Sequence, residues 1–223
     1  EVKRGLIDHV PELAIADILG STEGGMGQSI MTKDTPATET AKFTLLPVAK
    51  VLVPDGSREV VPGSGEVGMV AQGGMVPLGY YKDPEKSAKT FKEVDGKRYA
   101  FIGDMATVEA DGTINLLGRG SNCINTGGEK VFPEEVEEAL KLHADVADAL
   151  VFGLEDERFG NRVAGVVSLE QGRSAEAGDI LEATRKLLAS YKLPKDLLVV
   201  PVVPRAPNGK ADYKTAKSMM TGD

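Results

Sequence analysis

The sequence predicts an α+β fold in two parts that meet at a glycine-rich joint, residues 118–132. Before this joint, short apolar segments alternate with glycine and proline, which is typical of strands connected by turns. After it, helical and strand patterns alternate in a compact unit. Glycine content alone favours an ordinary surface loop for the joint, so the flanking segments decide its interpretation.

The first part begins with an apolar run from Leu13 to Leu19, which predicts a buried strand. Ser21, Thr22 and Glu23 follow it between glycines. Hydroxyls and backbone N–H groups suit phosphate oxygens, and a carboxylate suits Mg²⁺. A phosphate and metal site and a plain polar turn are equally good interpretations of this segment.

Further strands are expected at residues 49–53 and 113–117, with a turn at 109–113. Residues 63–68 have the spacing G-x-G-x-x-G but follow a proline and precede more glycines, so we expect a turn entering a strand. Asp83 is expected to cap a helix that runs to about Phe91. The strand from Arg98 ends at Asp104, and a strand end is a usual place for a functional acid.

The second part is predicted to open with a helix at Pro133, whose acidic run is interpreted as a solvated face. Strands are expected at 146–152 and 162–169, a helix at 179–191, and an edge strand at 197–203. The turn 204–210 then presents Lys210, which by itself is best explained as a solvated surface charge.

Composition excludes several classes of function. A net charge of −8 argues against a general nucleic-acid binder. No apolar run approaches the roughly 20 residues that span a bilayer. The single cysteine, Cys123, cannot form an internal disulfide, which favours a cytoplasmic location. His9 and His143 are too far apart in the sequence to indicate a zinc site.

Five segments in order, spread over nearly the whole chain, together resemble the adenylate-forming superfamily and, within it, the acyl-CoA synthetases. They are residues 19–23; 65–68 with 79–81 and 83–85; 99–104; 118–128; and 204–210. The resemblance implies that a carboxylic acid reacts with ATP to give an acyl-adenylate and pyrophosphate. CoA then displaces AMP from the acyl group.

The resemblance also implies roles for individual residues. Thr22 would contact the α-phosphate and Glu23 would hold Mg²⁺. Asp104 and Arg119 would bind the ribose of the nucleotide. Lys210 would approach the α-phosphate and the carboxylate oxygens during adenylation, where an ammonium offsets developing charge.

Ser121 matches the hinge of the family, and Gly127 with Gly128 matches the loop that lines the CoA channel. Two positions depart from the family pattern. Leu19 stands where an aromatic residue often packs near adenine, and Ser121 stands where the hinge is usually Asp or Lys. A hinge acts through its backbone, so the assignment of Ser121 is kept.

The phosphate loop of the family, rich in Ser, Thr and Gly and ending in Pro-Lys, has no match in this sequence. We therefore expect a C-terminal part of a longer enzyme, inactive alone, whose partner is the missing N-terminal part. Residues 1–120 would be the end of the large AMP-binding domain, and residues 121–223 a small mobile domain. A fatty or other hydrophobic acid is the expected substrate.

Other functions remain open on the sequence. The chain could be a non-catalytic nucleotide-binding module on the same scaffold. Within the enzymes, it could belong to an adenylation domain that delivers to a carrier protein or to a luciferase-like oxygenase. Retention of Lys210 together with Glu23, Asp104 and Arg119 favours the ligase, because a sensor has no need of Lys210.

Overall fold

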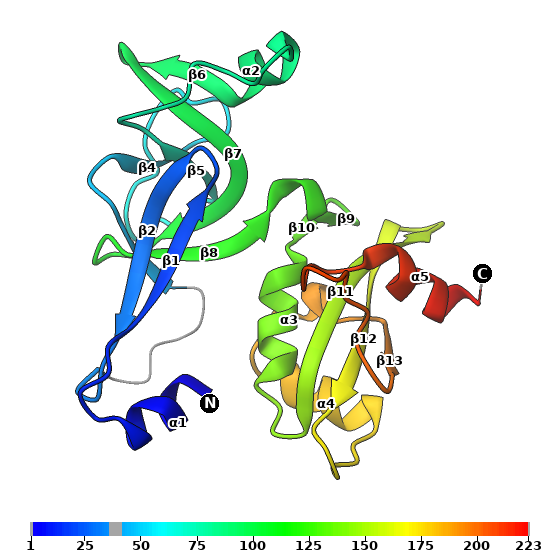
Figure 1. The fold of residues 1–223 in the computed structure, drawn as a ribbon. Helices are drawn as coiled ribbons and strands as arrows, with labels where there is room; N and C mark the ends of the chain where they lie inside the picture. Colours follow the sequence, from blue (N-terminus) through cyan, green and yellow to red (C-terminus); the bar gives the residue numbers. More distant parts are fainter. Residues whose placement is uncertain (1, 36–41, 223) are drawn as a thin grey trace. The chain divides into compact units, whose positions relative to one another are not determined.

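The computed structural model describes residues 2–35 and 42–222, which fold into two compact units, 1–117 and 118–223 (Figure 1). Both strands and helices are present, so the predicted α+β class is confirmed. The chain passes from one unit to the other between Leu117 and Gly118. The domain boundary predicted between residues 120 and 121 stays a prediction.

Unit 1, residues 1–117, is built on one antiparallel sheet in the order β1-β2-β3-β8-β7-β5-β4, with β6 paired to β7. Its strands are β1 (Ile15–Ser21), β2 (Gly24–Met31), β3 (Lys42–Leu45), β4 (Ala49–Leu52), β5 (Gly68–Gln72), β6 (Phe91–Val94), β7 (Lys97–Val108) and β8 (Ile114–Arg119), whose last two residues belong to unit 2. Met26, Val70 and Ile114 are fully buried in its core. The helices are α1 (Val2–His9) and α2 (Pro84–Thr90).

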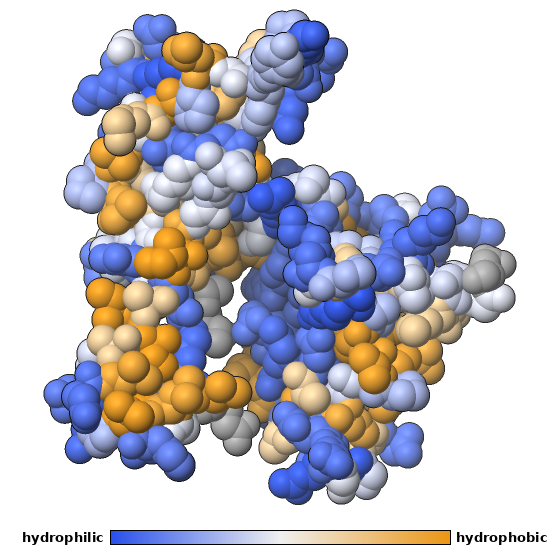
Figure 2. Space-filling model, in the orientation of Figure 1, coloured by the Kyte–Doolittle hydropathy of each residue, from blue (hydrophilic) through white to orange (hydrophobic). Residues whose placement is uncertain are grey.

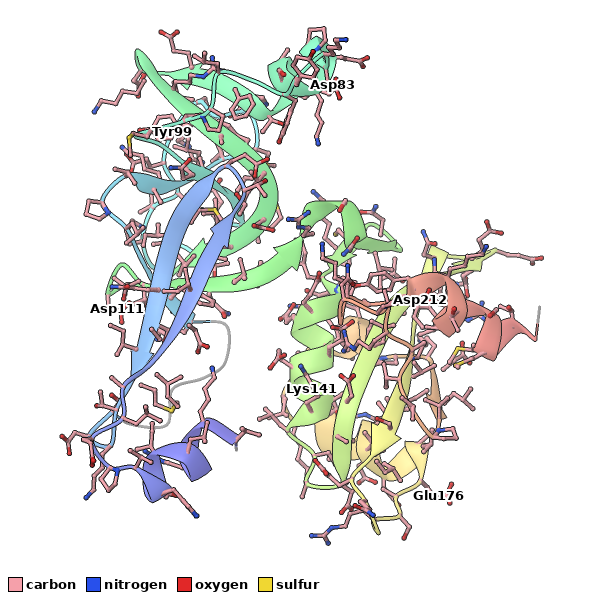
Figure 3. All side chains as sticks on the ribbon, viewed as in Figure 1. Asp83, Tyr99, Asp111, Lys141, Glu176 and Asp212 are labelled. Atoms are coloured by element: carbon pink, nitrogen blue, oxygen red, sulfur yellow. The ribbon has the colours of Figure 1, made fainter. Side chains whose placement is uncertain are left out.

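Local sequence signals explain how several of these elements begin. Asp83, labelled in Figure 3, caps α2 through a hydrogen bond from the backbone N–H of Lys86 at 3.0 Å, and Pro84 occupies the first turn. The turn between β7 and β8 is closed by the N–H of Glu109, which donates to the carbonyl of Thr113 at 2.8 Å. Both features match the predictions.

The strand predicted at residues 13–19 is present as β1, but its burial is not as predicted. Ile18 is 67% exposed, whereas Leu19 is 8% exposed. The reason is that only one face of β1 packs against the core, where Leu19 joins the buried cluster of unit 1. Successive side chains of a strand point to opposite faces, so those of β1 alternate between greater and lesser exposure.

Unit 2, residues 118–223, is a three-stranded sheet in the order β11-β12-β13, antiparallel between the first two strands and parallel between the last two. Apolar contacts place α3 and α4 on one face of this sheet and α5 on the other. The elements are η1 (Gly120–Asn122), β9 (Ile124–Thr126), β10 (Glu129–Val131), α3 (Pro133–Lys141), β11 (Val146–Asp156), β12 (Gly160–Leu169), α4 (Ala177–Thr184), η2 (Ser190–Lys192), β13 (Asp196–Val199) and α5 (Tyr213–Thr221).

Two predictions for unit 2 are wrong. The helix predicted at 179–191 ends at Thr184, because hydrogen bonding then tightens to i→i−3, with the Leu187 N–H donating to the Thr184 carbonyl at 2.9 Å. The acidic run of α3 is not simply a solvated face, because Glu137 is only 8% exposed. In the described part of the chain, no helix is long and apolar enough to cross a bilayer.

Candidate functional site

The predicted phosphate and metal segment is the tight turn between β1 and β2. The Thr22 hydroxyl donates to Glu23 Oε2 at 2.9 Å, and the Glu23 N–H donates to Ser21 Oγ at 3.1 Å. The hydroxyl of Tyr80 donates to the other carboxylate oxygen, Oε1. The Tyr80 bond is the main reason that the pKa of Glu23 falls to about 2, with Ser21 and Thr22 adding to it against partial burial. Glu23 is therefore a carboxylate at neutral pH.

Tyr80 is held firmly at this turn. Its N–H donates to Ser87 Oγ at 2.8 Å, its ring lies 5.3 Å from that of Phe91, and the Lys86 ammonium lies 4.0 Å from its ring centroid. The resemblance included Tyr80 but assigned it no role. The contact joins residues 57 positions apart, so no local pattern could have revealed it.

Glu23 fits a metal ion only as one ligand among several. Within residues 2–35 and 42–222, no group of three or more His, Cys, Asp or Glu side chains is arranged to hold a metal. Mg²⁺ commonly takes one or two carboxylates and fills its other positions with substrate phosphates and water. A single ionised Glu23 beside the Thr22 hydroxyl is consistent with that mode of binding.

Asp104 does not end its strand, contrary to the prediction. The strand β7 continues to Val108, because Met105, Ala106 and Val108 are apolar and buried. The pairing with β5 is irregular, since Phe101 pairs with Ala71 whereas Met105 pairs with Met69. Asp104 therefore lies in a bulge.

Gly103 explains how the bulge forms and what it does. Its φ of +93° is a conformation that glycine adopts readily. Bulges bend a strand and re-aim its side chains, and they are frequent beside active sites. In the strand order, β3 and β8 separate β7 from β2, but β2 also contacts β5, the other neighbour of β7. A Cβ on Gly24, beside Glu23, would lie 2.6 Å from the side chain of Gln72 on β5.

The first residues of the joint, 118–122, are organised by Glu134 of α3. Glu134 Oε1 accepts from the Arg119 N–H and from Asn122 Nδ2, each at 3.4 Å. Gly118 has a φ of +125°, and a Cβ there would lie 2.1 Å from Glu134 Oε2. Ser121 is exposed in the turn η1, and its hydroxyl donates to Asn122 at 3.4 Å. Glu134 is a contact of the joint that sequence reasoning missed.

Gly127 and Gly128 form the two-residue tip of the β9–β10 hairpin. Their φ values are +59° and +91°, as the favoured hairpin turns with two left-handed residues require. The Gly127 N–H donates to the Phe159 carbonyl at 3.0 Å, and a Cβ on Gly127 would lie 3.1 Å from the Phe159 ring. The turn alone accounts for both glycines, and their role in a CoA channel stays a prediction.

Lys210 lies on the returning arm of a tight hairpin, as the sequence predicts. Arg205 and Ala211 form a bridge, and the Ala206 N–H donates to the Lys210 carbonyl at 2.8 Å. The Lys210 N–H donates to Asn208 Oδ1 at 3.1 Å. The backbone of Lys210 is thus fixed while its side chain is exposed, so its ammonium can reach an anion outside the hairpin.

The chain is similar to known proteins. Residues 135–210 match the AMP-binding enzyme C-terminal domain. The chain is 47% identical over 219 residues to a medium/long-chain-fatty-acid–CoA/3-oxocholest-4-en-26-oate–CoA ligase of Mycolicibacterium smegmatis, covering 98% of this chain and 40% of that protein. It is 46% identical over 219 residues to the 3-oxocholest-4-en-26-oate–CoA ligase of Rhodococcus rhodochrous, covering 97% of this chain and 39% of that protein.

A solved structure gives the same result for the fold. The chain resembles ATP-bound MatB from Rhodopseudomonas palustris with a TM-score of 0.74 and 27% identity, over 90% of this chain and 39% of that one. The chain thus spans about two-fifths of the length of the curated relatives it matches.

Proposed function

Because this chain belongs to the adenylate-forming, AMP-binding enzymes and carries their C-terminal domain, we propose that it is part of an acid–thiol ligase. The ligase activates a hydrophobic carboxylic acid with ATP and transfers the acyl group to CoA. The observation that carries this proposal is the 47% identity, over 98% of the chain, to a protein named as a CoA ligase of such acids.

In the first half-reaction, a carboxylate oxygen of the acid attacks the α-phosphorus of ATP. The bond from that phosphorus to the bridging oxygen breaks, and pyrophosphate leaves with the electron pair. Lys210 offsets the charge that develops on the oxygens around phosphorus, and Thr22 donates to the α-phosphate. Asp104 and Arg119 bind the ribose. A Mg²⁺ ion held in part by Glu23 would neutralise phosphate charge when bound.

In the second half-reaction, the thiol of CoA attacks the acyl carbonyl, and AMP leaves with the electrons of the broken C–O bond. We assign the pivot between the two half-reactions to Ser121, because it is exposed in a short turn and its side-chain hydrogen bond to Asn122 is long, at 3.4 Å. Gly127 and Gly128 then line the path of the thiol. Because glycine has no side chain, both residues leave room for the thiol arm of CoA.

Two further properties belong to the same proposal. The substrate is a medium- or long-chain fatty acid or a sterol side-chain acid, in line with the names of the relatives. Unit 1 belongs to a larger domain, because it exposes apolar side chains on α1, β1 and β2 (Figure 2), namely Val2, Leu6, Ile18 and Ile30. The cytoplasm, which supplies ATP and CoA, is the proposed location.

Pyrophosphate release tests the proposal. The natural full-length protein is incubated with ATP, Mg²⁺ and a panel of fatty acids, then with CoA. We expect pyrophosphate with hydrophobic acids and an acyl-CoA product, and none from the 223-residue chain alone. ATP binding without pyrophosphate release from any acid would favour a non-catalytic nucleotide-binding module instead.

The Lys210→Ala variant tests the assignment of roles. Adenylation should fall roughly 100- to 1000-fold, as for the loss of one well-placed charge-stabilising donor. Formation of thioester from supplied acyl-adenylate should change little. An equal loss in both half-reactions would remove Lys210 from this role.

A further inference from the structure

The hairpin that carries Lys210 is attached to the sheet of unit 2 by an ion pair. Arg205 Nε donates to Asp148 Oδ2 at 2.9 Å, and Arg205 Nη2 donates to Asp148 Oδ1 at 2.7 Å. The two bonds form a bidentate pair, in which a guanidinium binds a carboxylate through two hydrogen bonds with a defined geometry. The two side chains are 33% and 32% exposed, so the pair is partly shielded from water.

Asp148 is itself fixed on a rigid element. It lies on β11, where the pairing with β12 slips between Val146 and Asp148. Its Oδ1 also accepts from the Ala149 N–H at 2.8 Å, which sets the direction of the carboxylate. On the same free edge of β11, the Glu137 carboxylate accepts from the Val151 N–H at 2.9 Å. The strand therefore presents a firm anchor rather than a mobile loop.

The hairpin transmits this anchor to Lys210 over a short path. Ala211 pairs with Arg205 across the hairpin, and Lys210 is the residue next to Ala211. Asp212, labelled in Figure 3, ends the hairpin by donating its N–H to the Pro204 carbonyl at 3.2 Å, and it also caps α5. Fixing the Arg205 guanidinium thus limits where the Lys210 backbone can lie.

We propose that Arg205 is a positioning residue for Lys210, which it aims by holding the hairpin to Asp148. This inference rests on the proposed function of Lys210 in adenylation. Arg205 touches no reacting atom in this role. It keeps the ammonium within the small range of positions from which charge at the α-phosphate is offset. A displacement of about 1 Å in such a group can cost roughly 100-fold in rate.

The first test measures both half-reactions in the natural full-length protein. Arg205→Ala should slow adenylation roughly 10- to 100-fold, less than Lys210→Ala, because the ammonium is still present. Thioester formation from supplied acyl-adenylate should be spared. Arg205→Lys keeps the charge but loses the paired geometry, so it should fall between Arg205→Ala and wild type. Asp148→Asn should slow adenylation in the same selective way.

The decisive measurement is the adenylation rate of the double variant, in which Arg205→Ala is added to Lys210→Ala. If Arg205 acts through Lys210, adding Arg205→Ala to Lys210→Ala should slow adenylation by less than about 3-fold, since coupled residues are strongly non-additive. A residue needed only for folding would slow adenylation as much in either background. It would also slow both half-reactions together. Either of those results would overturn the proposal.

Hydrogen exchange gives a readout that does not depend on activity. Residues 204–211 should exchange faster in Arg205→Ala than in wild type, and unchanged exchange would overturn the anchoring. Arg162→Ala is the matched control, because Arg162 pairs with Asp196 at 2.6 Å with 35% and 45% exposure and lies outside the hairpin. It should leave exchange of 204–211 and the adenylation rate unchanged. If wild type released no pyrophosphate, the proposed function would fail, while exchange would still decide the anchoring.

Discussion

Glu137 makes the stability of unit 2 depend on pH in a direction opposite to that of most carboxylates. It lies on α3 at 8% exposure, and its Oε1 accepts from the Val151 N–H of β11 at 2.9 Å. Burial is the main reason that its pKa rises from 4.5 to about 7, and Glu134 raises it further. The Val151 N–H, Lys141 and Arg205 act against the rise without cancelling it.

The sign of the effect follows from proton binding. Between pH 4.5 and about 7, folded Glu137 keeps its proton while the unfolded chain has lost it, so folding takes up protons. The stabilisation is therefore complete below pH 4.5 and is lost as pH rises through about 7. The full pKa shift corresponds to about 3 kcal/mol in the free energy of unfolding. About 2 kcal/mol of this stabilisation is lost between about pH 5.5 and about pH 8.

Urea denaturation followed by NMR signals of unit 2, at about pH 5.5 and about pH 8, measures this loss. Glu137→Gln keeps an oxygen for the Val151 N–H but cannot ionise, so the difference between the two pH values should shrink by about 2 kcal/mol. Glu182→Gln, on the exposed side of α4, is the control and should keep the wild-type difference. If Glu137→Gln also keeps the wild-type difference between the two pH values, the Glu137 carboxyl is already ionised in the folded protein at about pH 5.5 and the reasoning is wrong.

Three further predictions concern the proposed enzyme. Asp104→Ala should raise the ATP KM, since each charge-assisted hydrogen bond to ribose contributes about 1.5–3 kcal/mol; an unchanged KM would make Asp104 structural. Ser121→Pro should accumulate acyl-adenylate and form little acyl-CoA, because proline fixes φ near −65°, whereas Ser121→Ala should be close to wild type in both steps. Wild-type acyl-CoA formation by Ser121→Pro would place the pivot elsewhere. Gly128→Ala should destabilise unit 2 by about 1–2 kcal/mol in urea denaturation, because the φ of +91° at this position strains any residue with a Cβ. The added Cβ meets nothing within 4 Å, so backbone strain is the whole expected effect, and equal stability would contradict the turn geometry.

Local chemistry made much of the fold predictable from the sequence. Asp83 before Pro84 specified a capped helix start, and the Glu109–Thr113 turn specified a hairpin. The turn that presents Lys210 was predictable for the same reason, because Asn208 and Gly209 supply a side-chain acceptor and a positive φ of +79°. Each of these features depends on residues within a few positions of one another, so the sequence alone carries the information.

The sequence also determined the family, because five short segments keep their order along nearly the whole chain. It could not determine the strand position and the burial of individual acidic residues. Asp104 was expected at a strand end, but burial of Met105, Ala106 and Val108 extends β7 and leaves Asp104 in a bulge. The acidic run of α3 was expected in water, but packing against β11 buries Glu137.

Tertiary structure alone decided the contacts that set the properties of the candidate site. Tyr80 reaches Glu23 across 57 positions, and Arg205 reaches Asp148 across the same separation. Each partner has ordinary neighbours in the sequence, and only the docking of distant segments onto the sheets brings the pair together. The charge state of a carboxyl group depends on such contacts, because burial and hydrogen bonding shift its pKa away from the value typical of its residue type. The position of a loop depends on them too, because hydrogen bonds to a distant segment hold it in place.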